Sequence, residues 1–311
     1  MKILFAGNKA RGISCLEVLK KKYDIVGVIG NKASSNSNYF IDKSTSFGFK
    51  VLQPEDVNDK SFISKLKEFA PDITILAGYG QIVKKDFLSI SKYGCINLHG
   101  GKLPKYRGSS PMNWALINGD PSFTISIIQV DLGVDTGDIL IEKEIPIGAS
   151  DTINDLIDIA NKSFPSLLLK VLVQIEKQSM LPKKQDIALS SYYPLRFPED
   201  GIVFFDQLSA SQIHNRVKAL TFPFPGVISY YGTKKLKFFN SSMTKIPFFG
   251  EPGRIYRISK NKGILVCAKD KCLWLNNIVD YETNEEFKGK FNRYHKLATV
   301  SEVAQNFYEN R

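Results

Sequence analysis

The stretch CINLHGGKLPKYRGSSP, residues 95–111, decides the fold class of this chain. Its first five residues read as an apolar strand that ends at His99. The next twelve residues contain Pro104, Pro111 and three glycines, so they can form neither a helix nor a central strand. An apolar strand followed by a shaped loop is where open α/β sheets bind ligands. We therefore predict an α/β fold with a site at this strand end; the alternative is a surface turn with basic side chains.

Two polar side chains of this strand, and one farther along the chain, form a candidate catalytic set. Asn97 and His99 are two positions apart in an extended segment, so their side chains point to the same side. Asp135 follows in the run GVDTGD, residues 133–138. An amide can donate to a carbonyl oxygen that gains charge, an imidazole can donate or move a proton, and a carboxylate can accept a proton from an attacking amine. The set points to acyl transfer onto an amine. The alternative is that these are ordinary polar residues whose hydrogen bonds are satisfied within the fold.

Strands and helices alternate along the first two thirds of the chain. Apolar runs predict strands at residues 2–6, 25–29, 50–52, 72–77, 95–99, 124–130 and 138–147. Helices are predicted at residues 13–22, 61–69, 111–118 and 153–176, with loops at 31–40 and 77–83. This alternation indicates a Rossmann-like, doubly wound, mostly parallel sheet. Because Gly7 and Gly12 do not complete a G-x-G-x-x-G pattern, a dinucleotide site is not expected.

The last third of the chain has a different pattern. Residues 179–198 are polar and contain three prolines, which favours a linker. A helix is then predicted at residues 209–220, followed by short strands at 227–231, 236–239, 253–259, 263–268 and 272–278. Several short strands separated by turns indicate a small β-barrel. We predict two domains, residues 1–199 including the linker and residues 200–311.

Composition narrows the class of protein. With 311 residues and 43% hydrophobic side chains, the chain can build two cores. It has no apolar run long enough to cross a membrane, so no membrane partner is expected. Without a targeting segment or metal-ligand spacing, we expect a cytoplasmic protein with no metal and with four reduced thiols, at Cys15, Cys95, Cys267 and Cys272.

The positive charge is concentrated toward the end of the chain. The net charge is +11, of which +7 falls in residues 200–311 and +4 in residues 1–199. A polyanion such as tRNA is one interpretation. A lysine-rich surface around a site for small anionic substrates is the other.

Four short motifs resemble those of the folate-dependent formyltransferases. They are NLHG at residues 97–100, LPKYRG at 103–108, PMNW at 111–114 and DTGD at 135–138. RVKAL and PFPG, at residues 216–220 and 223–226, resemble the start of the second domain in the tRNA and nucleotide-sugar branches, which implies an OB-like C-terminal domain. The resemblance implies formyl transfer from 10-formyltetrahydrofolate without a metal, catalysed by Asn97, His99 and Asp135.

The resemblance also implies contacts to both substrates. Folate contacts are expected around two loops, at Tyr79, Gln81, Ile82, Val83, Leu103, Asp131 and Val134. The candidates for contacting the acceptor are Asn8, Lys9, Arg11, Lys105, Arg107 and Ser109. A plain surface or structural role is the alternative for each of these six residues.

The acceptor amine separates the branches of the family. The tRNA enzymes are similar to one another in a long basic loop after the second strand. Here the corresponding residues 30–47 contain only Lys32 and Lys43 as cations, beside Asp42. Because phosphate contacts dominate affinity for nucleic acids, this composition argues against tRNA.

The residues around the candidate catalytic set also argue against the tRNA branch. Gly100 and Gly101, with MNW at residues 112–114, are closer to the enzymes acting on UDP-4-amino-4-deoxy-arabinose and related amino sugars than to the tRNA branch. Ser109 stands where the arabinose enzyme has an arginine, so a nucleotide-linked 4-amino-4,6-dideoxyhexose is equally expected. Hydrolysis of the formyl folate fits least, since those enzymes lack the second domain.

We therefore expect a nucleotide-sugar N-formyltransferase that supplies precursors of lipopolysaccharide or other surface polysaccharides. Its partner would be a small nucleotide sugar, and a homodimer is one option for its assembly. The alternative is methionyl-tRNA formyltransferase, for which initiator tRNA would be the partner.

Overall fold

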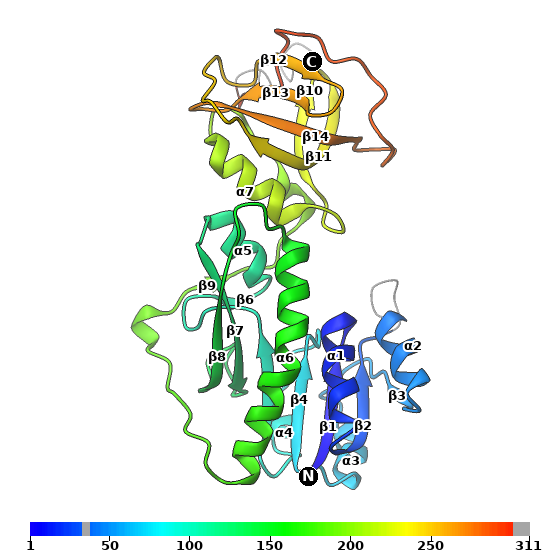
Figure 1. Cartoon of the computed structure of the whole chain (residues 1–311). Helices are drawn as coiled ribbons and strands as arrows, with labels where there is room; N and C mark the ends of the chain where they lie inside the picture. Colours follow the sequence, from blue (N-terminus) through cyan, green and yellow to red (C-terminus); the bar gives the residue numbers. More distant parts are fainter. Residues whose placement is uncertain (33–37, 301–311) are drawn as a thin grey trace. The chain divides into compact units, whose positions relative to one another are not determined.

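A computed structural model describes residues 1–32 and 38–300 (Figure 1). The chain packs as two compact units. The first comprises residues 1–111, 122–146 and 157–194; the second comprises residues 112–121, 147–156 and the chain from Leu195 onward. The chain therefore enters the second unit more than once. The predicted domain boundary after residue 199 stays a prediction.

The first unit is built on a seven-stranded sheet. Its strands are β1 (Lys2–Gly7), β2 (Asp24–Gly30), β3 (Val51–Leu52), β4 (Ile73–Ala77), β5 (Cys95–His99), β7 (Ser122–Gln129) and β8 (Ile139–Pro146). They lie in the order β3-β2-β1-β4-β5-β7-β8, parallel from β3 to β5 and antiparallel at β7 and β8. The chain winds outward from β1 in both directions, as in a doubly wound sheet. The predicted α/β fold with a mostly parallel sheet is confirmed.

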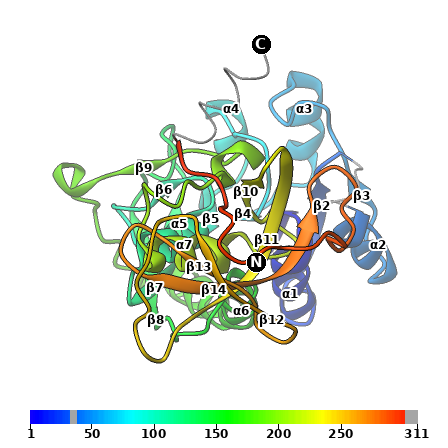
Figure 2. The same cartoon turned by 90° about the horizontal axis from the view of Figure 1, so that it is seen from above.

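Helices cover both faces of this sheet. They are α1 (Lys9–Leu19), α2 (Asn38–Ser46), α3 (Lys60–Glu68), α4 (Lys85–Leu88) and α6 (Ile153–Glu176). Figure 2 shows α1 and α6 on one side of the strands and α3 and α4 on the other. Side chains of β1 alternate accordingly: Leu4 clusters with Ile63 and Phe87, whereas Phe5 stacks on Phe40 at a centroid distance of 6.4 Å.

Helix α1 begins four residues before the predicted start at Ile13. The side chain of Asn8 accepts a hydrogen bond from the Lys9 backbone N–H at 2.9 Å and caps the helix. Gly12 lies inside the helix against Phe40, where a Cβ would approach the ring to 2.7 Å. Close packing against this ring explains why a glycine stands inside the helix.

Helix α2 was not predicted. It begins at Asn38, within the polar loop expected over residues 31–40, and residues 33–37 of that loop lie outside the described residues. Only Phe40 and Ser44 of the helix are buried, so its polar sequence carries a weak helical signal.

In its described residues, the second unit contains an antiparallel sheet and the α-helices α5 and α7. The helices are α5 (Pro111–Asn118) and α7 (Ala210–Leu220), and the strands are β10 (Val227–Tyr231), β11 (Lys234–Met243), β12 (Ile255–Ser259), β13 (Gly263–Cys267) and β14 (Cys272–Asp280). The strands lie in the order β10-β11-β14-β13-β12. Ser209 and Gln212 form a capping box at the start of α7, which packs on β11. The predicted C-terminal β domain is confirmed as an antiparallel sheet.

One expectation about the cysteines is wrong. Cys267 and Cys272 form a disulfide, whereas Cys15 and Cys95 are free and buried. The two bonded cysteines are direct cross-strand partners on β13 and β14, so the short turn between the strands places their side chains opposite each other. Sequence spacing alone did not reveal this register.

The structure adds a finding on membranes. Within the described residues, none of the helices combines the length and the apolarity that a membrane span requires.

Candidate active site

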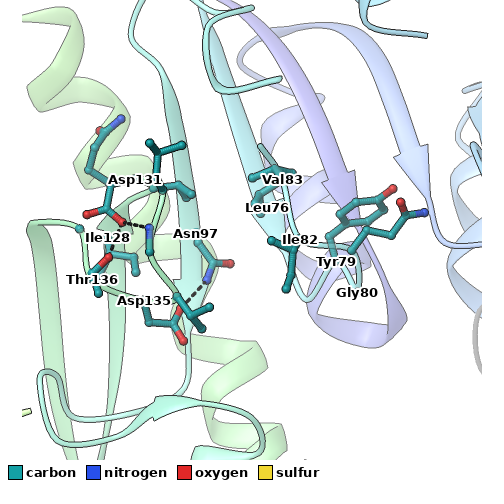
Figure 3. Close-up of a pocket in the computed structure, with 17 residues that line it drawn as sticks. Leu76, Tyr79, Gly80, Ile82, Val83, Asn97, Ile128, Asp131, Asp135 and Thr136 are labelled. Carbon is teal, nitrogen blue, oxygen red and sulfur yellow. Dashed lines mark hydrogen bonds between the residues drawn. The ribbon is translucent and has the colours of Figure 1, made fainter. Parts of the chain in front are cut away.

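Asn97, His99 and Asp135 converge in the first unit. Asn97 and His99 project from β5, and Asp135 lies in the loop between β7 and β8. The Asn97 amide donates to Asp135 Oδ1 at 3.4 Å (Figure 3). His99 Nδ1 lies 3.5 Å from Asp135 Oδ2. The side chains of His99 and Asp135 are only 5% and 12% exposed, so their interaction is weakly screened by water.

The loop that carries Asp135 is held in an unusual shape. Asp135 has a left-handed backbone conformation, with φ of 53°. Gly137 packs directly on β7, where a Cβ would lie 1.8 Å from the Gln129 carbonyl oxygen. The Gly108 backbone N–H donates to Asp135 Oδ2 at 2.9 Å. These constraints direct the carboxylate toward β5.

Hydrogen bonding defines which His99 nitrogen carries a proton. His99 Nε2 lies 2.6 Å from the Tyr106 carbonyl oxygen. A carbonyl oxygen only accepts, so Nε2 must donate, and Nδ1 is the nitrogen that faces Asp135. Burial lowers the pKa of His99, while Asp135 and the Tyr106 carbonyl act in the opposite direction. Nδ1 is therefore the ring nitrogen through which His99 can share a proton with the Asp135 carboxylate.

A glycine makes room for this arrangement. A Cβ on Gly101 would lie 2.6 Å from His99 Nε2 and 2.7 Å from the Tyr106 carbonyl oxygen. Any side chain at this position would push apart the two atoms that orient the imidazole.

A pocket opens onto the site. It is lined by Leu76, Tyr79, Gly80, Gln81, Ile82, Val83, Asn97, Ile128, Gln129, Val130, Asp131, Leu132, Gly133, Val134, Asp135, Thr136 and Gly137. Figure 3 shows the loop after β4 on one side and the Asp135 loop on the other, with Asn97 between them. Ile82 and Leu132 are each 73% exposed, although both are large and apolar. Exposed apolar side chains around a pocket are typical of a binding site.

Most of the residues expected to contact folate line this pocket. They are Tyr79, Gln81, Ile82, Val83, Asp131 and Val134. Leu103 does not; it is buried behind the lining, against Ile128 and Ile139. The Gln81 side chain accepts from the Val57 N–H at 2.8 Å and donates to the Pro54 carbonyl oxygen, so only its backbone remains for a ligand. The hydroxyl of Tyr79 is buried and has no hydrogen-bond partner in the described part of the chain.

Arg107 is buried, and its guanidinium forms hydrogen bonds within the protein. It is 2% exposed, and its guanidinium donates to Gln185 Oε1 from Nε at 3.1 Å and from Nη2 at 2.9 Å. Gln185 Nε2 in turn donates to the carbonyl oxygens of Asp135, at 2.8 Å, and Gly137, at 2.7 Å. Arg107 and Gln185 thus hold the loop that carries the candidate base. Sequence reasoning missed Gln185, because a glutamine in a polar segment carries no motif.

The other acceptor candidates do not form one cluster. Asn8 caps α1, Lys9 and Lys105 are exposed, and the Ser109 hydroxyl lies 3.4 Å from that of Ser110. Arg11 projects from α1 with its guanidinium near the Leu98 carbonyl and has no ion-pair partner among the described residues.

Comparison with known proteins agrees with this geometry. Residues 1–172 match the formyl transferase family, and residues 197–289 match the formyl transferase C-terminal domain. The chain belongs to the formyl transferase family. It is therefore an enzyme that transfers formyl groups.

Individual relatives of this formyltransferase come from two branches. Methionyl-tRNA formyltransferase of Ruminiclostridium cellulolyticum is 30% identical over 298 residues, covering 93% of this chain and 94% of the relative. The N-formyltransferase from Helicobacter canadensis, solved with folinic acid and dTDP-3-aminofucose, has a TM-score of 0.71 and 21% identity, covering 89% of this chain and 99% of that one. Methionyl-tRNA formyltransferase from Clostridium thermocellum has a TM-score of 0.56 and 21% identity, covering 78% and 94%. At these identities the two solved structures show the shared fold.

Proposed function

We propose that this formyltransferase moves a formyl group from 10-formyltetrahydrofolate to the amine of a nucleotide-linked amino sugar, a precursor of surface polysaccharide. One observation carries the proposal: the pocket with apolar rims ends at Asn97 and Asp135. A donor bound there would present its formyl group to an amide donor and a carboxylate at the same place.

The lining of the pocket fits a folate. Ile82 and Leu132 can cover the faces of a flat heterocycle, and the backbone of residues 81–83 can pair with its polar edge. The folate would supply an activated formyl group, and the chain would supply its orientation.

The roles of the three polar residues follow from their contacts. Asn97 lines the pocket with an amide donor beside Asp135, and it stabilises the charge that develops on the formyl oxygen. An attacking amine must lose a proton, and Asp135, the pocket carboxylate next to Asn97, can accept it. His99 lies behind Asp135, with Nδ1 facing the carboxylate, so it can share that proton.

This assignment changes the predicted role of His99. The sequence interpretation gave His99 a part in holding the oxyanion. Its Nε2–H is already directed at the Tyr106 carbonyl, and His99 does not line the pocket. A place in proton transfer therefore fits the hydrogen bonds better than a place beside the formyl oxygen.

The segment after β2 favours a small acceptor. Residues 30–47 contain two cations, Lys32 and Lys43, and Lys32 forms an ion pair with Glu55. The counter-ion release that drives tRNA binding requires many unpaired cations along the path of the nucleic acid. The Helicobacter canadensis enzyme, whose fold is shared over 89% of this chain, was solved with an amino sugar linked to dTDP.

The second candidate acceptor is initiator methionyl-tRNA. It is favoured by the 30% identity over 93% of the chain to a methionyl-tRNA formyltransferase. The charge of +7 in residues 200–311 is compatible with a polyanion.

An acceptor screen tests the proposal. The enzyme would be incubated with 10-formyltetrahydrofolate and either initiator methionyl-tRNA or a panel of UDP- and dTDP-linked amino sugars, and the N-formyl product would be measured. Asp135→Asn serves as the control for enzymatic turnover with every acceptor. We expect turnover with a nucleotide amino sugar and weak, salt-sensitive tRNA binding. Efficient formylation of methionyl-tRNA at physiological salt, with none of the sugars accepted, would replace this proposal with the second candidate.

A further inference from the structure

Arg11 is a half-buried cation beside the active-site strand. Its Nη1 donates to the Leu98 carbonyl oxygen at 3.4 Å, and its guanidinium carbon lies 5.0 Å from the centre of the Phe164 ring. Its Nε is buried without a hydrogen-bond partner in the described part of the chain. Burial lowers the pKa of this guanidinium, as expected for a charge removed from water.

The charge of Arg11 has no local counter-ion. Within residues 1–32 and 38–300, no carboxylate forms an ion pair with it. A charge partly removed from water and without a partner is costly, so its retention calls for an explanation. The Leu98 carbonyl that accepts from Arg11 directly precedes His99 on β5, and the Asp135 carboxylate faces His99 Nδ1. When the His99–Asp135 pair holds no extra proton, its charge of −1 balances the +1 of Arg11.

We propose that Arg11 is a positioning residue that sets the proton affinity of the His99–Asp135 pair and keeps it ready to accept the proton of the acceptor amine. The proposal rests on the proton-accepting role proposed above for that pair. It replaces the substrate-binding role expected for Arg11 from the sequence.

The groups around His99 give the direction of the effect. Burial and the cation of Arg11 lower the pKa of His99, whereas Asp135 and the Tyr106 carbonyl raise it. Removing Arg11 leaves both raising groups in place. The imidazole of a charge-removing variant therefore binds its second proton at higher pH than that of the wild type.

Substitutions separate this role from simple packing. Arg11→Met keeps length and apolar contact but removes the charge, and Arg11→Gln removes the charge while retaining a donor for the Leu98 carbonyl. Arg11→Lys keeps the charge. Phe164→Leu removes the ring beneath the guanidinium and leaves the charge in place.

The titration of His99 can be measured by NMR without an acceptor substrate. The chain has three histidines, so the imidazole signals can be assigned with single His variants. The His99 titration midpoint should move to higher pH in Arg11→Met and Arg11→Gln, and each unit of movement is about tenfold in proton affinity. It should stay near the wild-type position in Arg11→Lys and Phe164→Leu. His214, in the second unit, should not move in any variant.

Two results of the NMR titrations would overturn the proposal. A His99 titration that is unchanged in folded Arg11→Met or Arg11→Gln would overturn the proposal, as would an equal movement in Phe164→Leu. If Arg11→Met fails to fold, the titration of His99 in Arg11→Gln decides the test. Failure of the acceptor screen would leave these titrations unaffected, so the two proposals fail separately.

Discussion

Strand β5 and the segment of residues 183–193 both shape the candidate site, but in different ways. Strand β5 presents Asn97 and His99 toward the Asp135 loop. The later segment presents no reacting group; it braces that loop, because Gln185 donates to the carbonyl oxygens of Asp135 and Gly137. The comparison shows that the position of a reacting carboxylate depends on residues about fifty positions farther along the chain. Substitutions in β5 or the Asp135 loop should slow the chemical step. Substitutions in residues 183–193 should lower the stability of the protein and shift the Asp135 loop.

The largest effect is expected from Asp135→Asn. The amide keeps the shape and the hydrogen bond from the Gly108 N–H but cannot accept the amine proton. The chemical step should slow by about 100- to 10,000-fold, as for a lost general base. Single-turnover kinetics, on a variant shown to bind formyl folate and acceptor, would measure it. A normal chemical rate would remove the base role from Asp135.

Asn97→Ala should have the next largest effect. The variant loses the amide donor that lines the pocket, so turnover should fall by about 100- to 1,000-fold. Because the amide only donates to Asp135 at 3.4 Å, the melting temperature should change little. Turnover near that of the wild type would exclude an oxyanion contact through Asn97.

Gln185→Met tests the bracing segment. The substitution leaves Nε and Nη2 of Arg107 without their acceptor and two loop carbonyls without their donor, which should cost about 1–3 kcal/mol of stability. Turnover should fall by less than in Asn97→Ala, since all reacting groups remain. The exposed Gln207, replaced by Met, is the matched control. If Gln185→Met matched Gln207→Met in both unfolding free energy and turnover, the brace would have no role.

The smallest effect concerns a half-buried histidine outside both segments. Burial and Lys218 lower the pKa of His214 from 6.5 to about 4. The unfolded chain therefore binds this proton more readily, and stability should fall as the pH drops from about 6.5 to about 4. Thermal melts should show a smaller loss over this range in His214→Gln than in the wild type. Equal losses would show that His214 does not contribute.

The strand and the brace also differ in how far the sequence predicts them. Asn97 and His99 could be placed on one face of a strand because their spacing matches the β period. The convergence of Asp135 depends on a left-handed residue and on Gly137 packing against β7, which short motifs mark without explaining. The mostly parallel sheet followed from alternating patterns, whereas the disulfide depended on a cross-strand register that sequence spacing does not encode.

Three residues have contacts in the structure that the sequence does not predict. Arg107 and Arg11 look like substrate-binding cations in the sequence, and Gln185 looks like part of a linker. Their contacts arise from long-range packing: Arg107 meets Gln185 and Arg11 meets Phe164. A cation in a loop motif carries no signal for whether its charge faces a substrate or the interior.

The position of a bound formyl folate tests the central claim most directly. A crystal structure with 5-formyltetrahydrofolate, which resists transfer, would locate the ligand. We expect its ring system between residues 79–83 and the Asp135 loop, with the formyl group directed at the Asn97 amide and the Asp135 carboxylate. A folate bound elsewhere, or one whose formyl group points away from both side chains, would contradict the account.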